Sequence, residues 1–204
     1  MARLRFGVLI SGSGSNLQAI LDACVEGTVD GDVAVVISNK GDAYGLQRAR
    51  KADVPALHLD AATYADRAAY DHAVCEALDA HEVDYVVMAG YMKLLGAEVL
   101  SAYPMRVVNI HPALLPSFPG AHAIRDAFDH GVKLTGVTVH FANEVFDEGP
   151  IIAQEAVPVL EDDTIEVLES RIHAVEHMLY PQVLAALAQR RITFEGRRVR
   201  VLPR

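Results

Sequence analysis

The feature that most constrains the fold is a repeated alternation of apolar runs and amphipathic segments in the first half of the chain. Short runs rich in β-branched residues, typical of buried strands, occur at 5–11, 33–38, 55–59, 84–89 and 106–110. Segments with apolar residues at helical spacing lie between them, at 17–24 after Asn16 as a candidate cap, and at 44–52, 64–81 and 97–102. This alternation predicts right-handed crossovers and a parallel sheet, with a ligand at the carboxyl ends of the strands.

The pattern changes in the second half of the chain. A helix is expected over 122–130, followed by strands over 134–141 and 151–158, whose short connection predicts antiparallel pairing. A long amphipathic helix over 164–189 and a hairpin over 192–201 complete the chain. We therefore predict a Rossmann-like α/β fold: a mostly parallel twisted sheet with helices on both faces and an antiparallel C-terminal portion. The chain is expected to form one domain over 1–204, with a nucleotide-binding half over 1–105 and a catalytic half over 106–204.

Composition excludes several classes of protein. The net charge of −9 over 204 residues argues against nonspecific binding to nucleic acid or to anionic membranes, which needs a basic surface. No apolar run approaches the ~18 residues of a membrane span. Cys24 and Cys75 are too few for a disulfide framework and match no metal-binding spacing, so we expect a reducing, cytoplasmic location and no metal.

The segment 107–120, VVNIHPALLPSFPG, contains the most suggestive pair of polar residues. Asn109 and His111 are two residues apart on a predicted strand, so their side chains project from the same face, and Pro112 helps to end the strand. An Asn amide can stabilise a developing oxyanion, and a His can transfer a proton near neutral pH. The pair therefore suits attack on a carbonyl carbon. Alternatively, Asn109 caps a turn and His111 is a hydrogen-bonded loop histidine.

A glycine-rich turn, residues 11–16 (SGSGSN), lies between the first strand and the first helix. Free N–H groups and the helix dipole make such a turn a place for an anion. The third glycine of a dinucleotide fingerprint is replaced by Leu17, and the nearby acid, Asp32, lies at the start of the second strand instead of its end. The turn therefore favours a monophosphate over a dinucleotide. A plain tight turn is the alternative.

The acidic loop at 143–150 contains three carboxylates, Glu144, Asp147 and Glu148. One of them, brought against His111, would orient the imidazole and favour its protonated form. We favour Asp147, although the residues alone do not distinguish it from the other two or from a solvated acidic turn. A metal site made of His111, His140 and a loop carboxylate is a weaker alternative, because no HxxxH-type pair supports it.

Motifs along nearly the whole chain indicate a family. SGSGSN, SNK, AGYMKLL, NIHPALLPSFPG, TGVTVHF, DEGPII and EHMLYP occur in the order in which the folate-dependent formyltransferases carry them, and the chain resembles the phosphoribosylglycinamide formyltransferase branch. The resemblance implies transfer of a formyl group from 10-formyltetrahydrofolate to the amine of 5-phosphoribosylglycinamide, in purine biosynthesis. It implies small-molecule partners, no nucleic acid, no membrane and no metal, in a monomer or homodimer.

The resemblance also assigns residues, each at the position that matches the family's motif. It implies catalysis by Asn109, His111 and Asp147; binding of the ribosyl phosphate by Gly14, Ser15, Asn16, Leu17 and Gln18, and of the glycinamide end by Glu176; and binding of folate by Arg67, Met92, Lys93, Leu94, Leu95 and Asn109. Lys93, Ser117 and His173 depart from residues familiar in the family, and we leave His173 outside the predicted site. The bond between Leu115 and Pro116 is expected to be cis.

Other functions remain open at this point. A 10-formyltetrahydrofolate deformylase would use the same three residues with water as the acceptor, but usually has an additional N-terminal domain. A methionyl-tRNA formyltransferase would need a basic RNA-binding domain. A noncatalytic nucleotide-binding module would tolerate loss of Asn109 and His111, and a dehydrogenase would hold a nicotinamide cofactor. The basic run at 197–200 is expected to be a solvated edge.

Overall fold

The computed structural model describes residues 3–203, so residues 1, 2 and 204, the ends of the predicted domain, lie outside the described residues. The strands are β1 (Leu4–Ile10), β2 (Gly31–Ser38), β3 (Ala56–His58), β4 (Tyr85–Met88), β5 (Val107–His111), β6 (Leu134–Phe141), β7 (Ile151–Pro158), β8 (Ile192–Glu195) and β9 (Arg198–Val201). The helices are α1 (Ser15–Val25), α2 (Tyr44–Lys51), α3 (Arg67–Ala80), α4 (Ala97–Ala102), α5 (Ala123–His130) and α6 (Ile165–Ala188), with a short 3-10 turn, η1 (Ala61–Thr63).

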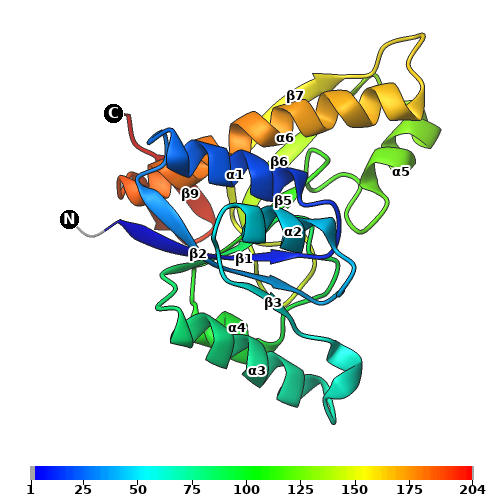
Figure 1. Cartoon of the computed structure of the whole chain (residues 1–204). Helices are drawn as coiled ribbons and strands as arrows, with labels where there is room; N and C mark the ends of the chain where they lie inside the picture. Colours follow the sequence, from blue (N-terminus) through cyan, green and yellow to red (C-terminus); the bar gives the residue numbers. More distant parts are fainter. Residues whose placement is uncertain (1–2, 204) are drawn as a thin grey trace.

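A single large sheet organises the molecule (Figure 1). Within residues 3–203 it has seven strands in the order β3-β2-β1-β4-β5-β6-β7. The pairs from β3 to β5 are parallel, whereas β6 and β7 are antiparallel to their neighbours. The predicted parallel sheet with an antiparallel portion is therefore confirmed. β5 is the boundary strand, since it runs parallel to β4 and antiparallel to β6.

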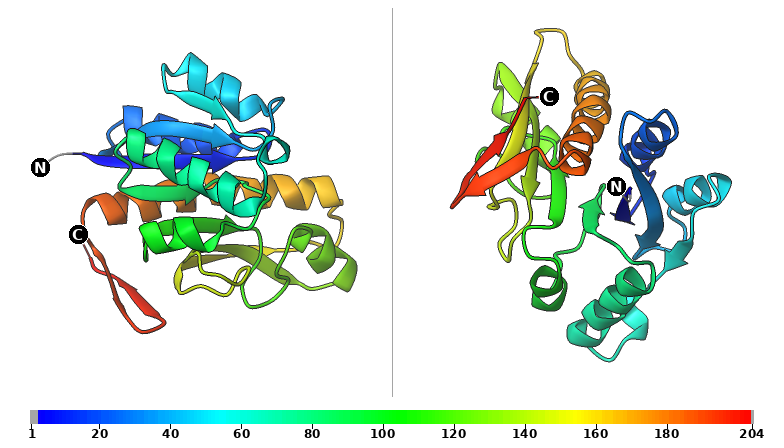
Figure 2. Two further views of the ribbon diagram at one scale, coloured as in Figure 1. Left: turned by 90° about the horizontal axis from the view of Figure 1, so that it is seen from below. Right: turned by 90° about the vertical axis from the view of Figure 1, so that its left-hand side faces the viewer.

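Helices cover both faces of the sheet, as Figure 2 shows. Because side chains alternate along a strand, Val8 and Ile10 of β1 enter the apolar layer under α1, α2 and α6, whereas Leu9 enters the layer under α3 and α4. All three side chains are fully buried. Continuous apolar strands are thus explained by burial on both sides.

The long helix α6 connects the two halves of the sheet. It packs against α1 and against β6 and β7, and it continues across Pro181. The hydroxyl of Tyr180, which is fully buried, is shared between the carbonyl oxygens of Met88 in β4 (3.1 Å) and Val108 in β5 (2.9 Å). This contact fixes α6 beneath the two strands from whose ends the candidate site is built.

Two local predictions are wrong. The helix expected over 64–81 begins at Arg67, because Asp66 accepts a hydrogen bond from the N–H of Ala69 and caps it there, and the preceding turn is the separate η1. Asn16 does not cap α1. Gly14 is the capping residue, with a φ of 69° and no side-chain hydrogen bond, and the helix begins at Ser15. The other predicted elements are present, with small differences at their ends.

The strands β8 and β9 form a separate two-stranded hairpin that projects beside the sheet (Figure 2). β9 lies against β7, and Ile192 and Val199 pack on the core from this side. None of the helices described between residues 3 and 203 combines the length and the apolar character needed to cross a membrane.

Candidate active site

A cavity of about 470 Å³ lies at the carboxyl ends of β4 and β5, where the parallel sheet predicts a ligand. This volume is in the range of small-molecule sites. Its walls are mostly apolar, and a few polar side chains converge on one side. The residues discussed below that line it are Met88, Met92, Leu94, Leu95, Asn109, His111, His140 and Asp147.

Asn109 and His140 face each other across the β5–β6 pair, where they are register partners. The Nδ2 atom of Asn109 lies 3.2 Å from Nε2 of His140. The other ring nitrogen of His140 lies 2.9 Å from the carbonyl oxygen of Phe141, which can only accept, so Nδ1 carries a proton. In neutral His140, Nε2 then accepts from the Asn109 amide. This contact fixes the orientation of the amide at the cavity wall.

His111 is buried, and both of its ring nitrogens face oxygen acceptors. Nε2 donates to the carbonyl oxygen of Phe118 at 2.8 Å, and Nδ1 lies 3.4 Å from Oδ2 of Asp147. A neutral imidazole has one proton to offer, whereas an imidazolium has two. Only an imidazolium could donate to both of these oxygens.

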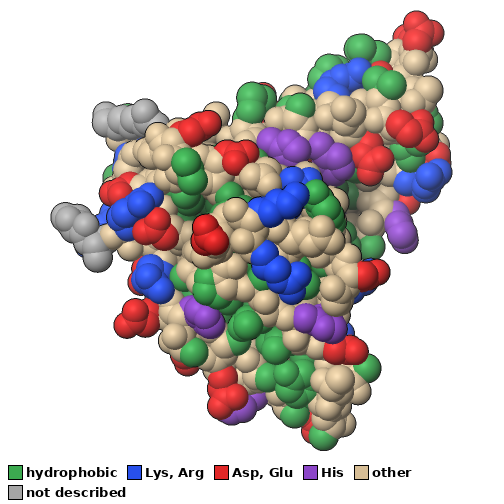
Figure 3. All heavy atoms as spheres, in the orientation of Figure 1, with side chains coloured by type: hydrophobic (Ala, Val, Ile, Leu, Met, Phe, Trp, Pro, Cys, Tyr) green, Lys and Arg blue, Asp and Glu red, His purple; other side chains and the backbone are tan. Residues whose placement is uncertain are grey.

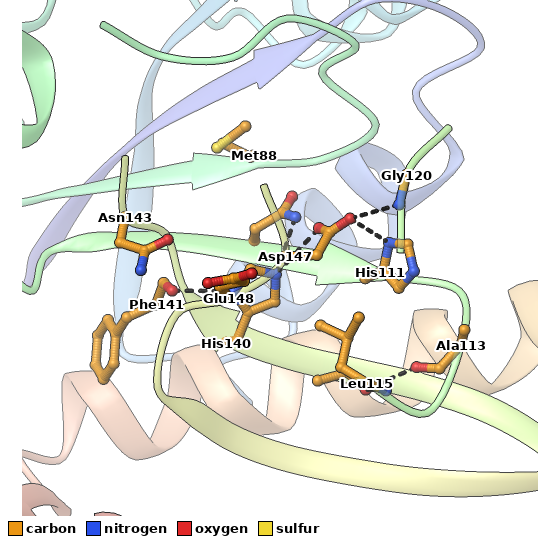
Figure 4. Close-up of polar contacts among 12 residues, drawn as sticks. Met88, His111, Ala113, Leu115, Gly120, His140, Phe141, Asn143, Asp147 and Glu148 are labelled. Carbon is orange, nitrogen blue, oxygen red and sulfur yellow. Dashed lines mark hydrogen bonds and ion pairs between the residues drawn. The ribbon is translucent and has the colours of Figure 1, made fainter. Parts of the chain in front are cut away.

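Asp147 is the carboxylate that reaches the histidines. Its Oδ2 accepts from the N–H of Gly120 at 2.8 Å, and its Oδ1 lies 3.6 Å from Nε2 of His140 (Figure 4). Burial raises the pKa of Asp147, but His140, the Gly120 N–H and His111 together hold that pKa below its usual value. Glu144 and Glu148 are exposed. The structure thus selects Asp147, as favoured from the sequence.

The segment that follows β5 is held from below by β6 and β7. The hydroxyl of Thr138 donates to the carbonyl oxygen of Ala113 (2.7 Å) and accepts from the N–H of Leu115 (3.1 Å). Gln154 of β7 donates to the carbonyl oxygen of Leu115 (2.9 Å). The bond between Leu115 and Pro116 is cis, as the resemblance implied. This support fixes the loop that carries the Phe118 carbonyl and the Gly120 N–H.

The glycine-rich turn lies beside α6, so predicted residues far apart in the sequence come together. The amide Nδ2 of Asn16 donates to Oε2 of Glu176 at 3.0 Å. Leu17 points into the core, so only its backbone faces the turn, and Gln18 accepts from Arg48 at 3.1 Å. The first-turn N–H groups after Gly14 have no partner within the helix and are available to an anion.

His173, which we left outside the predicted site, lies in this second region. Its Nδ1 lies 2.8 Å from Oε2 of Glu176, and this hydrogen bond raises the pKa of His173. Its ring stacks on His177 with centroids 6.3 Å apart, and Figure 3 shows histidine side chains together along α6. Within residues 3–203, the buried atoms Oδ1 of Asn16 and Nε2 of His177 have no hydrogen-bond partner. Buried polar atoms without partners are those that a polar ligand would satisfy.

The predicted folate residues divide into two groups. Met92, Leu94 and Leu95 line the 470 Å³ cavity, with Met92 63% exposed. Arg67 and Lys93 do not line it. They line a smaller cavity of about 410 Å³ that shares Leu94 with the first, where Arg67 donates to the carbonyl oxygen of Leu94 at 2.8 Å. The two cations thus lie beside the apolar cavity, where a ligand that extends beyond this cavity would meet them.

The sequence did not reveal the role of His140 or of the backbone groups of Phe118 and Gly120. One signal was present: Thr138 and His140 are polar alternate residues near the end of a mostly apolar strand, so they share a face. Among the described residues, no group of three or more His, Cys, Asp or Glu side chains has an arrangement that could hold a metal ion.

Known proteins give this geometry a context. A model of the family described as formyl transferase matches residues 4–184. A phosphoribosylglycinamide formyltransferase of Bacillus subtilis is 43% identical over 183 residues, 90% of this chain and 94% of that protein. The crystal structure of glycinamide ribonucleotide transformylase 1 from Symbiobacterium toebii is 57% identical, with a TM-score of 0.97 over 99% of this chain and 95% of that one.

A formyltetrahydrofolate deformylase from Pseudomonas syringae pv. tomato is also similar, but less so. It is 31% identical with a TM-score of 0.90, and the match covers 98% of this chain but 66% of that one. The family match extends over both the glycine-rich turn and the Asn109–His111–Asp147 cluster. This chain therefore belongs to the formyl transferase family and, within it, groups with the phosphoribosylglycinamide formyltransferases.

Proposed function

We propose that this enzyme transfers the formyl group of 10-formyltetrahydrofolate to the amine of 5-phosphoribosylglycinamide, a step of purine biosynthesis. The observation that carries the proposal is the convergence of Asn109, His111 and Asp147 on one wall of an apolar cavity in a chain of this family. The apolar walls suit a flat pterin, and the polar wall suits a carbonyl group that is attacked.

The proposed catalytic roles follow from the contacts. The substrate amine is itself the nucleophile, so no Ser or Cys intermediate is needed. The Asn109 amide donates to the formyl oxygen as that oxygen gains negative charge. Protonated His111 stabilises the same charge and delivers a proton to the folate nitrogen as the carbon–nitrogen bond breaks. The proton that the amine loses returns to His111 and restores the imidazolium. Asp147 keeps the imidazole charged and oriented, because the low pKa of the Asp147 carboxyl keeps it ionised in this site.

We assign the ribosyl phosphate to the glycine-rich turn and α6. The N–H groups at the start of α1 would hold the phosphate. Glu176 is buried, and Asn16 and His173 both contact its Oε2 atom. Its carboxylate would accept hydrogen bonds from hydroxyl or amide groups of the substrate. Arg67 and Lys93 would meet the carboxylates of the folate tail, since their cavity adjoins the apolar one. Holding two substrates together in this way accounts for part of the rate.

Hydrolysis of 10-formyltetrahydrofolate is the second candidate function, and the comparisons favour it less. Identity is 43% and 57% to the two formyltransferases described above, against 31% to the deformylase. We also propose that the enzyme acts in the cytoplasm, which suits its buried free thiols, Cys24 and Cys75.

A paired turnover assay tests the proposed function. Tetrahydrofolate release from 10-formyltetrahydrofolate is followed by absorbance with and without the ribonucleotide, for wild-type protein and for His111→Ala. His72→Ala, an exposed histidine on α3, is the matched control. We expect release only with the ribonucleotide, lost in His111→Ala and retained in His72→Ala. Release without the ribonucleotide would favour the hydrolase. No release in either case would indicate a noncatalytic binding protein.

A further inference from the structure

The C-terminal hairpin touches the loop that carries Asp147, although it lies beyond the segment matched by the family, residues 4–184. Arg197 is in the turn between β8 and β9. Its Nη2 donates to the carbonyl oxygen of Glu148 at 2.7 Å. Glu148 directly follows Asp147, so the guanidinium group holds the Glu148–Gly149 peptide unit, one residue beyond the carboxylate that faces His111.

A second contact joins the hairpin to the base of the same loop. The ring of Phe194, in β8, meets the ring of Phe141 edge-on, with centroids 6.3 Å apart and planes at 70°. Phe141 is buried at the end of β6, and its N–H donates to the carbonyl oxygen of Pro150 at 2.9 Å, which closes the loop. The hairpin thus contacts the acidic loop at its base and at the peptide that follows Glu148.

The loop has little of its own structure to fix its conformation. Asp147 has a φ of 57°, in the left-handed region that Gly, Asn and Asp adopt more readily than other residues. Val145 and Phe146 are 52% exposed, so the outer part of the loop gains little from packing. On the inner side the carboxylate is held by the N–H of Gly120. On the outer side the peptide is held by Arg197.

We propose that Arg197 is a positioning residue for the reaction: by holding the peptide between Glu148 and Gly149, it keeps the Asp147 carboxylate against His111. The inference rests on the proposed function, because it assigns Asp147 a part in formyl transfer. Arg197 is exposed, as expected for the basic run at 197–200, and it is also bonded to the loop.

Three variants of the full-length chain test this role. Arg197→Ala removes the donor, Arg197→Lys retains a positive donor, and Arg200→Ala removes an exposed arginine of the same hairpin. We expect Arg197→Ala to lower kcat about three- to tenfold, with the KM for the ribonucleotide unchanged. The lysine variant should restore most of the rate, and Arg200→Ala should match wild type. Hydrogen exchange of backbone amides in residues 143–150 should be faster in Arg197→Ala alone.

A double-mutant cycle with Asp147→Asn distinguishes positioning from a general structural effect. If Arg197 acts through the carboxylate, Arg197→Ala causes no further loss of kcat once that carboxylate is an amide. Equal behaviour of Arg197→Ala and Arg200→Ala in rate and exchange would overturn the inference, as would losses that multiply in the cycle. If wild type transfers no formyl group, the proposed function fails, and the exchange comparison alone still decides whether Arg197 holds the loop.

Discussion

Replacing Asp147 by Asn tests whether the site depends on the charge of this residue or only on its shape. The amide is isosteric, and its oxygen still accepts from the N–H of Gly120. The same oxygen also faces Nδ1 of His111, so the NH₂ group takes the place of Oδ1, near Nε2 of His140. The variant therefore retains the contacts of the loop and removes the negative charge beside His111.

The distance between the two groups bounds the effect. Unit charges at the 3.4 Å that separates Nδ1 of His111 from Oδ2 of Asp147 attract by about 5 kcal/mol at an effective dielectric constant of about 20, and by about 1 kcal/mol in water. Both side chains are only 5% exposed, so the larger value is the better guide. A loss of about 3 to 4 kcal/mol corresponds to a 100- to 1000-fold lower kcat.

The assay is ribonucleotide-dependent release of tetrahydrofolate at pH 7, with thermal unfolding of each variant as a control for folding. Asp147→Ala, which also removes the acceptor for Gly120, should lose at least as much activity and should be less stable. A loss of kcat below about tenfold for Asp147→Asn, in a protein that melts like wild type, would refute the reasoning. The attraction between Asp147 and His111 would then be no stronger than between two such charges in water.

Three further changes test the fold around the site. Tyr180→Phe removes the hydroxyl shared by two strand carbonyls and should lower the free energy of unfolding by about 1–2 kcal/mol, measured by urea denaturation. Gly149→Ala would place a Cβ 1.6 Å from the carbonyl oxygen of Phe141, so we expect a loss of about 3 kcal/mol or more in the same measurement, against almost none for Gly12→Ala, where nothing lies within 4 Å. The hydrogen bond from Arg171 lowers the pKa of Asp163 to about 2. The contribution of the Asp163 carboxylate to stability is therefore full above about pH 4 and is lost as the pH falls toward 2. The difference in unfolding free energy between wild type and Asp163→Asn should shrink over that window and stay constant from pH 5 to 8.

Most of the fold could be predicted because burial on both faces of a parallel sheet leaves a simple pattern of apolar runs. The errors arose where a polar side chain had two possible partners. Asn16 has the side chain of a typical helix cap, but its amide bonds to Glu176, which is distant in sequence. Asp66 accepts the backbone N–H of Ala69, so the helix that periodicity suggested from residue 64 begins at Arg67.

The candidate site could be predicted only in part, for similar reasons. Alternation along one strand was enough to bring Asn109 and His111 to the same face. The contact between Asn109 and His140 depends on the register of two strands. Which of the three carboxylates in the acidic loop reaches His111 depends on how that loop is closed. The resemblance placed Arg67 and Lys93 with the folate residues, and no local pattern shows that they line the neighbouring cavity.

The path of α6 has a consequence for how this protein unfolds. The helix belongs to the second half of the chain, yet it packs on α1 and bonds through Tyr180 to β4, so neither half keeps its core when the other is lost. Unfolding should therefore be a single cooperative event. Damage to the core should reduce the number of competent molecules rather than produce a population that holds the ribosyl phosphate without being able to react.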